Sequence, residues 1–316
     1  MNERFLIFRN GSIGNTLVAV PAIKALREAY PDAFIAIVSE LLKYCPYADE
    51  LYVYEKKGQH KSLWANFKFL WRLRRKKFTK AILFKRFFRN GFLSFLAGIP
   101  ERIGYETHGK APFLTQTIPY VEGRNIVELN LDLVKSIGIE AKDNRLELWA
   151  GKDEKQKVDN FLKEHGVSGK AIKIVFHVGG ITAKNQSWPI KNYAALADRL
   201  MGAFSATAIL LAPEGEHPEV QRAAELMERD PIVALKFSVL ETAELIRRCQ
   251  LFIGSDSGPS HMADAVGTPG VIFYPSRPDM RKWKPLSEKY VALIVNDSIE
   301  EGFAACEQIL ALRSRA

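Results

Sequence analysis

A loop of small residues after a short apolar run is the segment best suited to bind an anion. The run Leu251–Ile253 predicts a strand, and Gly254–His261 (GSDSGPSH) leads into a helix that begins near Pro259. Backbone N–H groups of such a loop and the positive end of the helix dipole stabilise a phosphate. We therefore predict a phosphate site here.

The two ionisable residues of this loop have different expected roles. His261 lies in the first helical turn, where it can donate a hydrogen bond to a phosphate oxygen. Asp256 would repel a phosphate, so we expect it to fix loop amides or to cap the helix. The alternative is a plain helix cap with a buried histidine.

A second loop follows the apolar run Ile172–His177. Gly179 and Gly180 open space for backbone amides, and Lys184 can reach a phosphate as a mobile point charge. The alternative is a flexible loop that carries a core tryptophan, Trp188.

A carboxylate follows the apolar run Thr207–Leu211. The segment Ala212–His217 (APEGEH) contains Glu214 and Glu216. A carboxylate at a strand end can accept both hydroxyls of a ribose. The alternative is charge complementarity with the next helix.

The first loop, Arg9–Asn15 (RNGSIGN), joins an apolar run to a helical pattern. Gly11 and Gly14 allow close approach of backbone amides to a ligand. The middle glycine of a GxGxxG motif is missing, so a dinucleotide site is weakly supported. An ordinary tight turn is an equal alternative.

The elements that carry these loops alternate between apolar runs and helical patterns in both halves of the chain. This alternation predicts two parallel, doubly wound α/β sheets in tandem, with a cleft between the domains. We place an N-terminal domain at residues 1–165 and a C-terminal domain at residues 166–316. The helix Asp153–His165 is expected to bridge the halves, and the last helix is a candidate for packing back on the first domain. Ligands are expected beyond the carboxyl ends of the strands.

The net positive charge comes entirely from the first half of the chain. Residues 1–165 hold 28 Lys and Arg against 19 Asp and Glu, whereas residues 166–316 hold 17 of each. Eleven of the basic residues fall between Lys61 and Arg89, with no acidic residue there. Such a field attracts nucleic acid, anionic lipid or phosphorylated glycans. A solvated helix face is the alternative.

Aromatic side chains recur at helical spacing in this basic segment. Trp64, Phe67, Leu70 and Trp71 either pack inward or contact lipid, and the sequence does not decide between the two.

Composition limits the remaining classes. No apolar run approaches the roughly 18 residues of a membrane-spanning helix, and the N-terminus lacks a signal-peptide pattern. Cys45, Cys249 and Cys306 are expected to be buried in a reducing compartment, without a metal. We expect a cytoplasmic protein.

Together these loops and the segment Ala97–Tyr105 resemble glycosyltransferase family 9, the ADP-heptose:lipopolysaccharide heptosyltransferases, over nearly the whole chain. The Asp-Ser/Thr-Gly-x-x-His signature of the family is present from Asp256 to His261. The resemblance implies a GT-B fold of two Rossmann-like domains, the N-terminal one for the acceptor and the C-terminal one for the donor. The donor residues that we assign are Gly179, Gly180, Thr182, Lys184, Gln186, Glu216, Asp256, Ser257, Gly258 and His261. The acceptor residues that we assign are Ser12, Gly14, Lys85, Arg86, Arg89 and Arg102.

Two positions depart from the family pattern. The family has a catalytic Asp after the first-loop glycine, and this chain has Asn15 there. An amide cannot accept a proton at neutral pH, although it can orient a hydroxyl. Glu40 is our first alternative base and Asp49 the second. The family Lys usually lies two residues before Trp-Pro, where this chain has Gln186, with Lys184 further upstream.

The resemblance implies an inverting transfer by single displacement, without a metal or a cofactor. The donor is a nucleotide sugar, with ADP-heptose expected, and the acceptor is a lipid-linked anionic glycan. Contact with the anionic inner membrane at its cytoplasmic face is a further expectation, and the phosphate-loop pattern argues against nucleic acid. A weak or inactive sugar-binding relative and a nucleotide-sugar epimerase are the alternatives.

Overall fold

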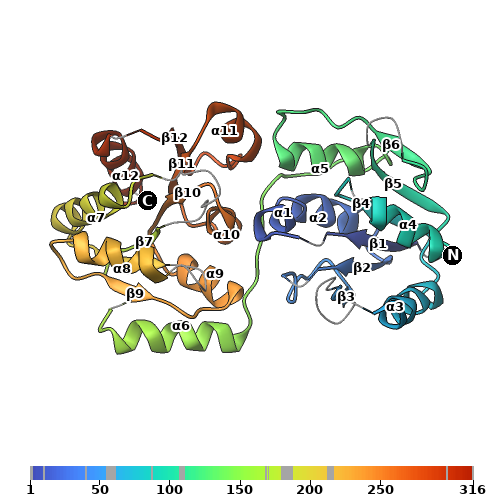
Figure 1. The fold of residues 1–316 in the computed structure, drawn as a ribbon, viewed down its shortest axis with the longest axis horizontal. Helices are drawn as coiled ribbons and strands as arrows, with labels where there is room; N and C mark the ends of the chain where they lie inside the picture. Colours follow the sequence, from blue (N-terminus) through green and yellow to red (C-terminus); the bar gives the residue numbers. More distant parts are fainter. Residues whose placement is uncertain are drawn as a thin grey trace. The chain divides into compact units, whose positions relative to one another are not determined.

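The chain forms two compact α/β units. The computed structural model describes residues 3–9, 11–39, 41–54, 62–86, 88–106, 111–167, 169, 171–178, 188–211, 217–296 and 298–314. The units are Met1–Leu146 and Glu147–Ala316, and each has its own parallel sheet with helices packed on it (Figure 1). The predicted pair of doubly wound sheets is confirmed.

The first unit contains a six-stranded parallel sheet in the order β3-β2-β1-β4-β5-β6. Its central strands are continuous apolar runs, as expected for strands covered on both faces. Phe69 and Leu73 of α3 and Leu93 of α4 pack in one core with Leu6 and Phe8 of β1. The elements are β1 (Arg4–Phe8), α1 (Ile13–Leu17), α2 (Val20–Ala29), β2 (Phe34–Val38), β3 (Glu50–Tyr52), α3 (Leu63–Arg75), β4 (Lys80–Leu83), α4 (Phe88–Leu96), β5 (Glu101–Tyr105), β6 (Gln116–Ile118) and α5 (Ile126–Lys135).

The second unit repeats this topology, with the order β12-β11-β10-β7-β8-β9. Strands β7, β10 and β11 are buried along their whole length. The elements are α6 (Lys152–Glu164), β7 (Lys173–His177), α7 (Ile190–Phe204), β8 (Thr207–Leu211), α8 (His217–Leu226), β9 (Ile232–Ala234), α9 (Val239–Arg247), β10 (Leu251–Ser255), α10 (Gly258–Val266), β11 (Gly270–Tyr274), α11 (Arg277–Trp283), β12 (Tyr290–Ile294) and α12 (Ile299–Ser314).

Each sheet has one topological switch point, where the strand order reverses. The loops that follow the two strands at this point are the candidate ligand-binding loops. In the first unit the chain order reverses between β1 and β4, where Phe8 pairs with Leu83. In the second unit it reverses between β7 and β10, where His177 pairs with Gly254. Because ligands of open α/β sheets bind beyond the carboxyl ends of the strands at such points, each unit has one place where a ligand is expected.

The unit boundary lies earlier than the sequence indicated. We expected it at residues 165/166, with the helix Asp153–His165 bridging the halves, whereas the units divide after Leu146. Helix α6 packs on α9 of the second unit, and Lys157 forms an ion pair of 2.8 Å with Glu241. Phe161 adds an edge-to-face contact with Phe237, so a polar helix is held by a few apolar and ionic contacts to one unit.

The core of the second unit contains the tryptophan of the second loop. Trp188 is buried, stacks on Phe273 at 4.0 Å and donates its indole N–H to the Asn296 carbonyl at 2.7 Å. Helix α12 packs on α7 and on β11 of the same unit. The three cysteines are buried, as expected.

Candidate functional site

The loop after β10 brings the amino end of a helix to the switch point of the second unit. Helix α10 begins at Gly258, with Ser257 at its N-cap in an extended conformation and Pro259 in the first turn. The loop is braced because the Ser257 N–H donates to Ser260 Oγ at 3.3 Å and the Ser260 hydroxyl donates to the Ser257 carbonyl at 2.7 Å. A helix amino end at a switch point attracts an anion through its dipole and its first amides.

A buried polar network fixes this loop from the side of the sheet. The Ser257 hydroxyl donates to the Ser255 carbonyl at 3.1 Å and lies 3.3 Å from His177 Nδ1. Ser255 Oγ in turn lies 2.8 Å from the Tyr193 hydroxyl. Burial lowers the pKa of His177 to about 4, so the imidazole is neutral at pH 7. Its Nε2 is buried and has no hydrogen-bond partner within the described part of the chain.

Asp256 and His261 lie close together on this loop. His261 Nε2 is 3.9 Å from Asp256 Oδ1, and the imidazole makes an edge contact with the Trp283 ring of α11. Burial lowers the pKa of His261 to about 4. Burial, and then the charge of Asp279, raises the pKa of Asp256 to about 7. A partly protonated carboxyl group repels a phosphate less than a carboxylate does, and a neutral imidazole still carries one N–H, so both can serve as neutral hydrogen-bond donors. Their contact with a ligand stays a prediction.

Several predicted residues lie outside the described part of the chain. They are the donor candidates Gly179, Gly180, Thr182, Lys184, Gln186 and Glu216, and the alternative base Glu40.

Asn15 lies at the switch point of the first unit and forms hydrogen bonds with two neighbouring side chains. Its Oδ1 accepts a hydrogen bond of 3.2 Å from Arg9 Nη2, and its Nδ2 donates to Ser12 Oγ at 2.7 Å. Gly14 is buried beneath the loop, whereas Ser12 is exposed. The sequence pattern alone gives Arg9 no role, although its place at the end of an apolar strand is a signal.

Lys85 enters the same region from the end of β4. A Cβ atom on Gly11 would lie 2.1 Å from Lys85 Nζ, so the ammonium rests against the glycine backbone. Gly11 also has a φ of 141°, which favours glycine. The strand-end lysine therefore reaches the first loop, which also carries the acceptor candidates Ser12 and Gly14, and acceptor binding by these residues stays a prediction.

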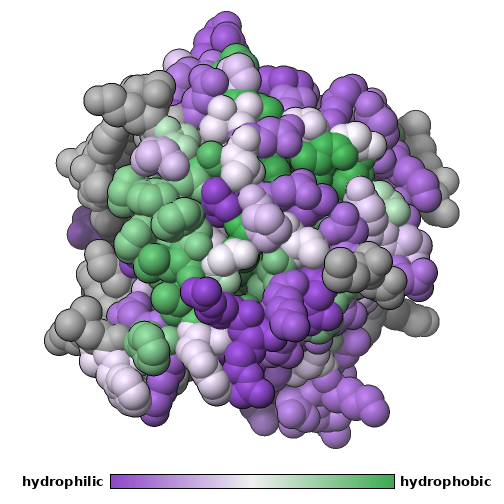
Figure 2. Space-filling model, turned by 90° about the vertical axis from the view of Figure 1, so that its right-hand side faces the viewer, coloured by the Kyte–Doolittle hydropathy of each residue, from purple (hydrophilic) through white to green (hydrophobic). Residues whose placement is uncertain are grey.

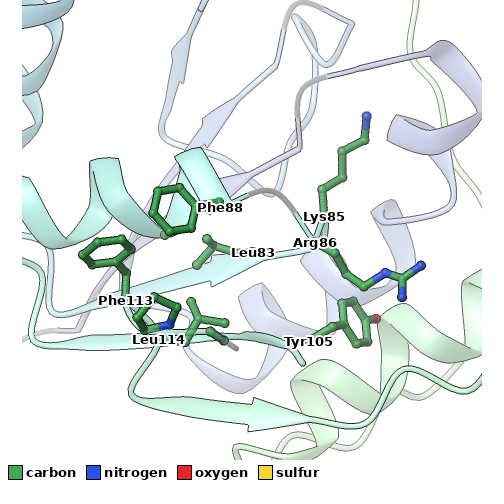
Figure 3. Close-up of a pocket in the computed structure, with 10 residues that line it drawn as sticks. Leu83, Lys85, Arg86, Phe88, Tyr105, Phe113 and Leu114 are labelled. Atoms are coloured by element: carbon green, nitrogen blue, oxygen red, sulfur yellow. The ribbon is translucent and has the colours of Figure 1, made fainter. Parts of the chain in front are cut away.

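Arg86 and Lys85 line one side of a small cavity of about 70 Å³. Figure 3 shows Arg86 beside Tyr105, with Phe88, Phe113 and Leu114 on the opposite side and Lys85 extended away from those three. Arg86 stacks over the Tyr120 ring at 3.9 Å and forms an ion pair of 3.2 Å with Glu122.

Arg89 and Arg102, two further acceptor candidates, have partners in the protein. Arg89 lies over the Tyr54 ring at 5.1 Å. The Arg102 guanidinium donates to the carbonyl oxygens of Phe113, at 2.5 Å, and Pro100, at 3.0 Å. Arg102 therefore holds the chain segment that borders the cavity.

Helix α3 presents three of its four aromatic residues outward. The exposed fractions of Trp64, Phe67 and Trp71 are 65%, 57% and 54%, whereas Phe69 and Leu73 face the core. Three of the four residues of the helical pattern are therefore exposed, whereas Leu70 packs against the core of the first unit, and contact with lipid stays a prediction. Cations accompany the rings, since Lys68 lies over Trp64 at 5.5 Å and Arg75 over Trp71 at 4.6 Å.

Helix α4 adds a second aromatic stripe, which the sequence analysis did not find. Phe88, Phe92 and Phe95 are exposed by 66%, 38% and 50%, and all three rings pack around Phe113. Arg74 of α3 reaches the end of α4 through a 3.5 Å hydrogen bond to the Leu96 carbonyl. Figure 2 displays a face with a hydrophobic patch bordered by hydrophilic residues. We call the outward side chains of α3 and α4 the aromatic-basic surface.

Two kinds of feature are missing from the described residues. No helix among them is long and apolar enough to cross a membrane. No cluster of three or more His, Cys, Asp or Glu side chains in the same residues could hold a metal ion.

The sequence of this chain is similar to those of known glycosyltransferases. Residues 66–306 match the family described as glycosyltransferase family 9 (heptosyltransferase). Lipopolysaccharide heptosyltransferase 3 of Escherichia coli is 25% identical over 301 residues, which cover 90% of this chain and 86% of that protein.

Solved structures show the same fold. A glycosyl transferase family 9 protein from Veillonella parvula has a TM-score of 0.89 at 24% identity, with 98% of each chain covered. The E. coli ADP-heptose LPS heptosyltransferase II has a TM-score of 0.78 at 20% identity, covering 99% of this chain and 100% of the other. The two-domain α/β architecture is that of GT-B heptosyltransferase structures.

Proposed function

The chain belongs to glycosyltransferase family 9 and is therefore a glycosyltransferase, and from this premise we propose that it transfers heptose from ADP-heptose to a lipopolysaccharide-core glycan. The relatives support the sugar and the acceptor class, because their names give heptose, ADP-heptose and lipopolysaccharide. The observation that carries the proposal is the braced Ser255–Gly258 loop at the amino end of α10, at the switch point of the second sheet.

The proposed reaction is a single displacement that inverts the anomeric carbon and needs no metal. An acceptor hydroxyl attacks that carbon, its bond to the diphosphate oxygen breaks, and ADP leaves with the electron pair. The amino end of α10 stabilises the charge that develops on the departing diphosphate. His261 and Asp256, adjoining that end, are the side chains proposed to contact the diphosphate or the sugar.

The acceptor is proposed to bind the first unit, at the carboxyl ends of β1 and β4. The cations at this edge, together with the excess of basic residues around them, suit a glycan that carries phosphate or carboxylate groups. The proton of the attacking hydroxyl needs an acceptor, and Asn15 is not one.

We further propose that the aromatic-basic surface contacts an anionic membrane, where a lipid-linked acceptor is available. Exposed Trp and Phe rings suit the headgroup region, and neighbouring Lys and Arg residues attract anionic lipids. The eleven basic residues between Lys61 and Arg89 supply the matching charge. This location corresponds to the cytoplasmic face of the inner membrane.

The test is ADP release. The purified chain is incubated with ADP-heptose and a phosphorylated inner-core acceptor, and ADP and the mass of the glycan are followed. We expect ADP and a glycan heavier by one heptose, only when both substrates are present. An altered nucleotide sugar without acceptor would indicate an epimerase instead. Parallel reactions with other nucleotide sugars establish the donor.

A second candidate function rests on one observation, the amide at Asn15. A family member without a base at this position binds both substrates and transfers sugar slowly or not at all. ADP-heptose binding without any glycan product, in a chain that is folded, would favour this candidate.

A further inference from the structure

His177 is a buried histidine at the carboxyl end of β7 that the proposed reaction does not use. The residue is only 1% exposed, and it pairs in the sheet with Gly254 of β10. A Cβ atom on Gly254 would lie 3.2 Å from His177 Cβ, so the glycine allows the two strands to approach closely at this point. The imidazole lies beside the loop that leads from β10 into α10, with its Nδ1 3.3 Å from Ser257 Oγ.

The Ser257 hydroxyl has one proton and two neighbouring atoms that could accept it. Its oxygen lies 3.1 Å from the Ser255 carbonyl oxygen and 3.3 Å from His177 Nδ1. A carbonyl oxygen can only accept, so a hydroxyl that donated to His177 would leave two oxygen atoms in contact without a proton between them. The hydroxyl proton therefore belongs to the Ser255 carbonyl, and the remaining contact requires His177 Nδ1 to be the donor.

The other nitrogen of the ring leads to the same tautomer. Nε2 of His177 is buried and has no hydrogen-bond partner among the residues that the structure describes. Burial lowers the pKa of His177 to about 4, so the ring is neutral at pH 7 and carries one proton. A buried N–H without an acceptor is rarer in proteins than a buried acceptor without a donor. The proton therefore lies on Nδ1, in agreement with the geometry at Ser257.

The contact has a consequence for the donor loop because Ser257 is the N-cap residue of α10. Its backbone is extended, and its carbonyl accepts a hydrogen bond of 2.7 Å from the Ser260 hydroxyl. The N-cap residue is the one at which the chain turns from the loop into the helix, so its conformation fixes where the first amides of the helix point. A donor that fixes the Ser257 hydroxyl from the side of the sheet therefore also fixes the amino end of α10, where an anion is attracted.

We propose that His177, with its proton on Nδ1, is a positioning residue that holds the Ser257 hydroxyl and so orients the amino end of α10 for the donor diphosphate. Ser257 then serves the site by its place at the N-cap, because its hydroxyl proton is already given to the Ser255 carbonyl. The role toward the diphosphate rests on the proposed function, whereas the hydrogen bond between His177 and Ser257 does not.

Two amide side chains distinguish the ring nitrogens. The side-chain nitrogen of asparagine lies as many bonds from the backbone as Nδ1 of histidine, and that of glutamine as many as Nε2. Calorimetric titration with ADP compares the wild type, His177→Asn and His177→Gln, and His165→Gln is the control because His165 is an exposed histidine of the same unit. We expect His177→Gln to bind ADP about fivefold more weakly, the loss typical of one neutral hydrogen bond. His177→Asn and His165→Gln should keep the affinity of the wild type.

The partner and the tautomer are tested separately. Because the Ser257 hydroxyl is expected to act through the same hydrogen bond, the double variant of His177→Gln with Ser257→Ala should bind ADP no more weakly than Ser257→Ala alone. Nuclear magnetic resonance of the wild type with isotope-labelled histidines should show the His177 proton on Nδ1, with the signal assigned by its absence from His177→Asn.

Three results would overturn the proposal. They are a proton on Nε2 in the wild type, equal ADP affinities of folded His177→Gln and His177→Asn, and losses from His177→Gln and Ser257→Ala that add. A wild type that binds no ADP would instead contradict the proposed function. The tautomer measurement needs no ligand, so a failed donor site and a failed hydrogen bond are distinguished.

Discussion

The two sheets of this chain have the same strand order, yet their carboxyl edges carry different polar and charged groups. At the switch point of the first unit, Arg9 donates to the neutral Asn15 side chain, and the Lys85 ammonium lies against Gly11 of the same loop. At that of the second, the described residues offer a helix amino end, neutral histidines and a carboxyl group of raised pKa. The first unit holds 24 basic and 14 acidic residues, and the second holds 21 and 22.

Topology therefore selects the place of a site and not its chemistry. Fixed backbone dipoles suit a group that is always present in the same form, such as the diphosphate of a nucleotide sugar. Side-chain charges can be gained or lost by single substitutions, so under the proposed function the first edge can change its acceptor while the second keeps its donor. The following changes test this contrast.

Asn15→Asp should have the largest effect. It supplies a base at the first edge, and general-base catalysis is worth roughly 10²–10⁴ in rate, so kcat should rise by about a hundredfold. The same carboxylate neutralises Arg9, so KM for an anionic acceptor should rise about tenfold, and donor affinity should not change. Initial rates at varied acceptor concentration separate the two effects. The charge control is Lys135→Gln, whose side chain is exposed on α5 and pairs with Glu140.

An unchanged kcat in Asn15→Asp would mean that the acceptor hydroxyl does not lie near this residue. If activity is instead lost in Glu40→Gln, the base belongs to the segment after β2. If neither change alters the rate, the acceptor hydroxyl lies elsewhere in the first unit.

Asp256→Asn tests the second edge through stability. Burial, and then Asp279, raises the pKa of Asp256 to about 7, above its unfolded value, so this carboxyl group costs stability as pH rises toward 7. The variant lacks that cost, so its free energy of unfolding relative to the wild type should increase by about 2 kcal/mol between pH 5 and pH 8. Urea denaturation at both pH values measures it.

The two histidines of this region titrate with the opposite effect on stability. Burial lowers the pKa of His177 and His261 to about 4, so both add stability as pH rises from about 4 to their unfolded value, a trend opposite to that of Asp256. Because both histidines are present in variant and wild type, they cancel in the difference. A difference that does not change with pH would show that Asp256 is ionised throughout.

His261→Ala addresses ligand contact at the same edge. Loss of a hydrogen bond to a charged phosphate typically costs about 1–3 kcal/mol, so ADP should bind roughly tenfold or more weakly. His165→Ala is a matched control, since His165 is an exposed histidine at the end of α6 in the same unit. Calorimetric titration with ADP gives both affinities, and equal affinities in folded variants would remove His261 from the binding site.

Much of the fold was predictable because both sheets are parallel and buried. Runs such as Phe34–Val38 and Leu251–Ile253 carry a continuous apolar signal and became strands β2 and β10. The boundary between units was not predictable, because α6 is polar and its attachment depends on contacts such as that between Lys157 and Glu241, which are distant in sequence.

The position of a candidate loop was predictable where it follows a strongly apolar strand, whereas the surroundings of a buried side chain were not. Arg9 looks like an ordinary charged residue at a strand end, and only its burial and its contact with Asn15 distinguish it. Arg102 shows the reverse case, since a basic residue in a family-like segment donates to backbone carbonyls. A sequence pattern does not show whether a charged side chain is buried, or which residue further along the chain accepts its hydrogen bond.

The smallest expected effect belongs to the aromatic-basic surface. Arg75→Gln removes one exposed cation beside Trp71, and each Lys or Arg near an anionic membrane contributes about 1 kcal/mol, so binding to vesicles of phosphatidylglycerol and phosphatidylethanolamine should fall about fivefold. Arg199→Gln, on α7 of the second unit, removes the same charge and should leave binding unchanged. Flotation measures both.

A salt titration separates the contributions of the basic residues and of the aromatic rings to membrane binding. Attraction between Arg75 and anionic headgroups is screened as ionic strength rises, because the Debye length falls from about 10 Å at 0.1 M to about 3 Å at 1 M. Insertion of the exposed Trp64 and Trp71 rings is not screened in this way. We therefore expect the difference between Arg75→Gln and the wild type to vanish at 1 M salt, while Trp71→Ala stays weaker than the wild type. Equal binding of the wild type to anionic and neutral vesicles at low salt would contradict a role for the basic residues, and the first unit would then owe its positive charge to the acceptor alone.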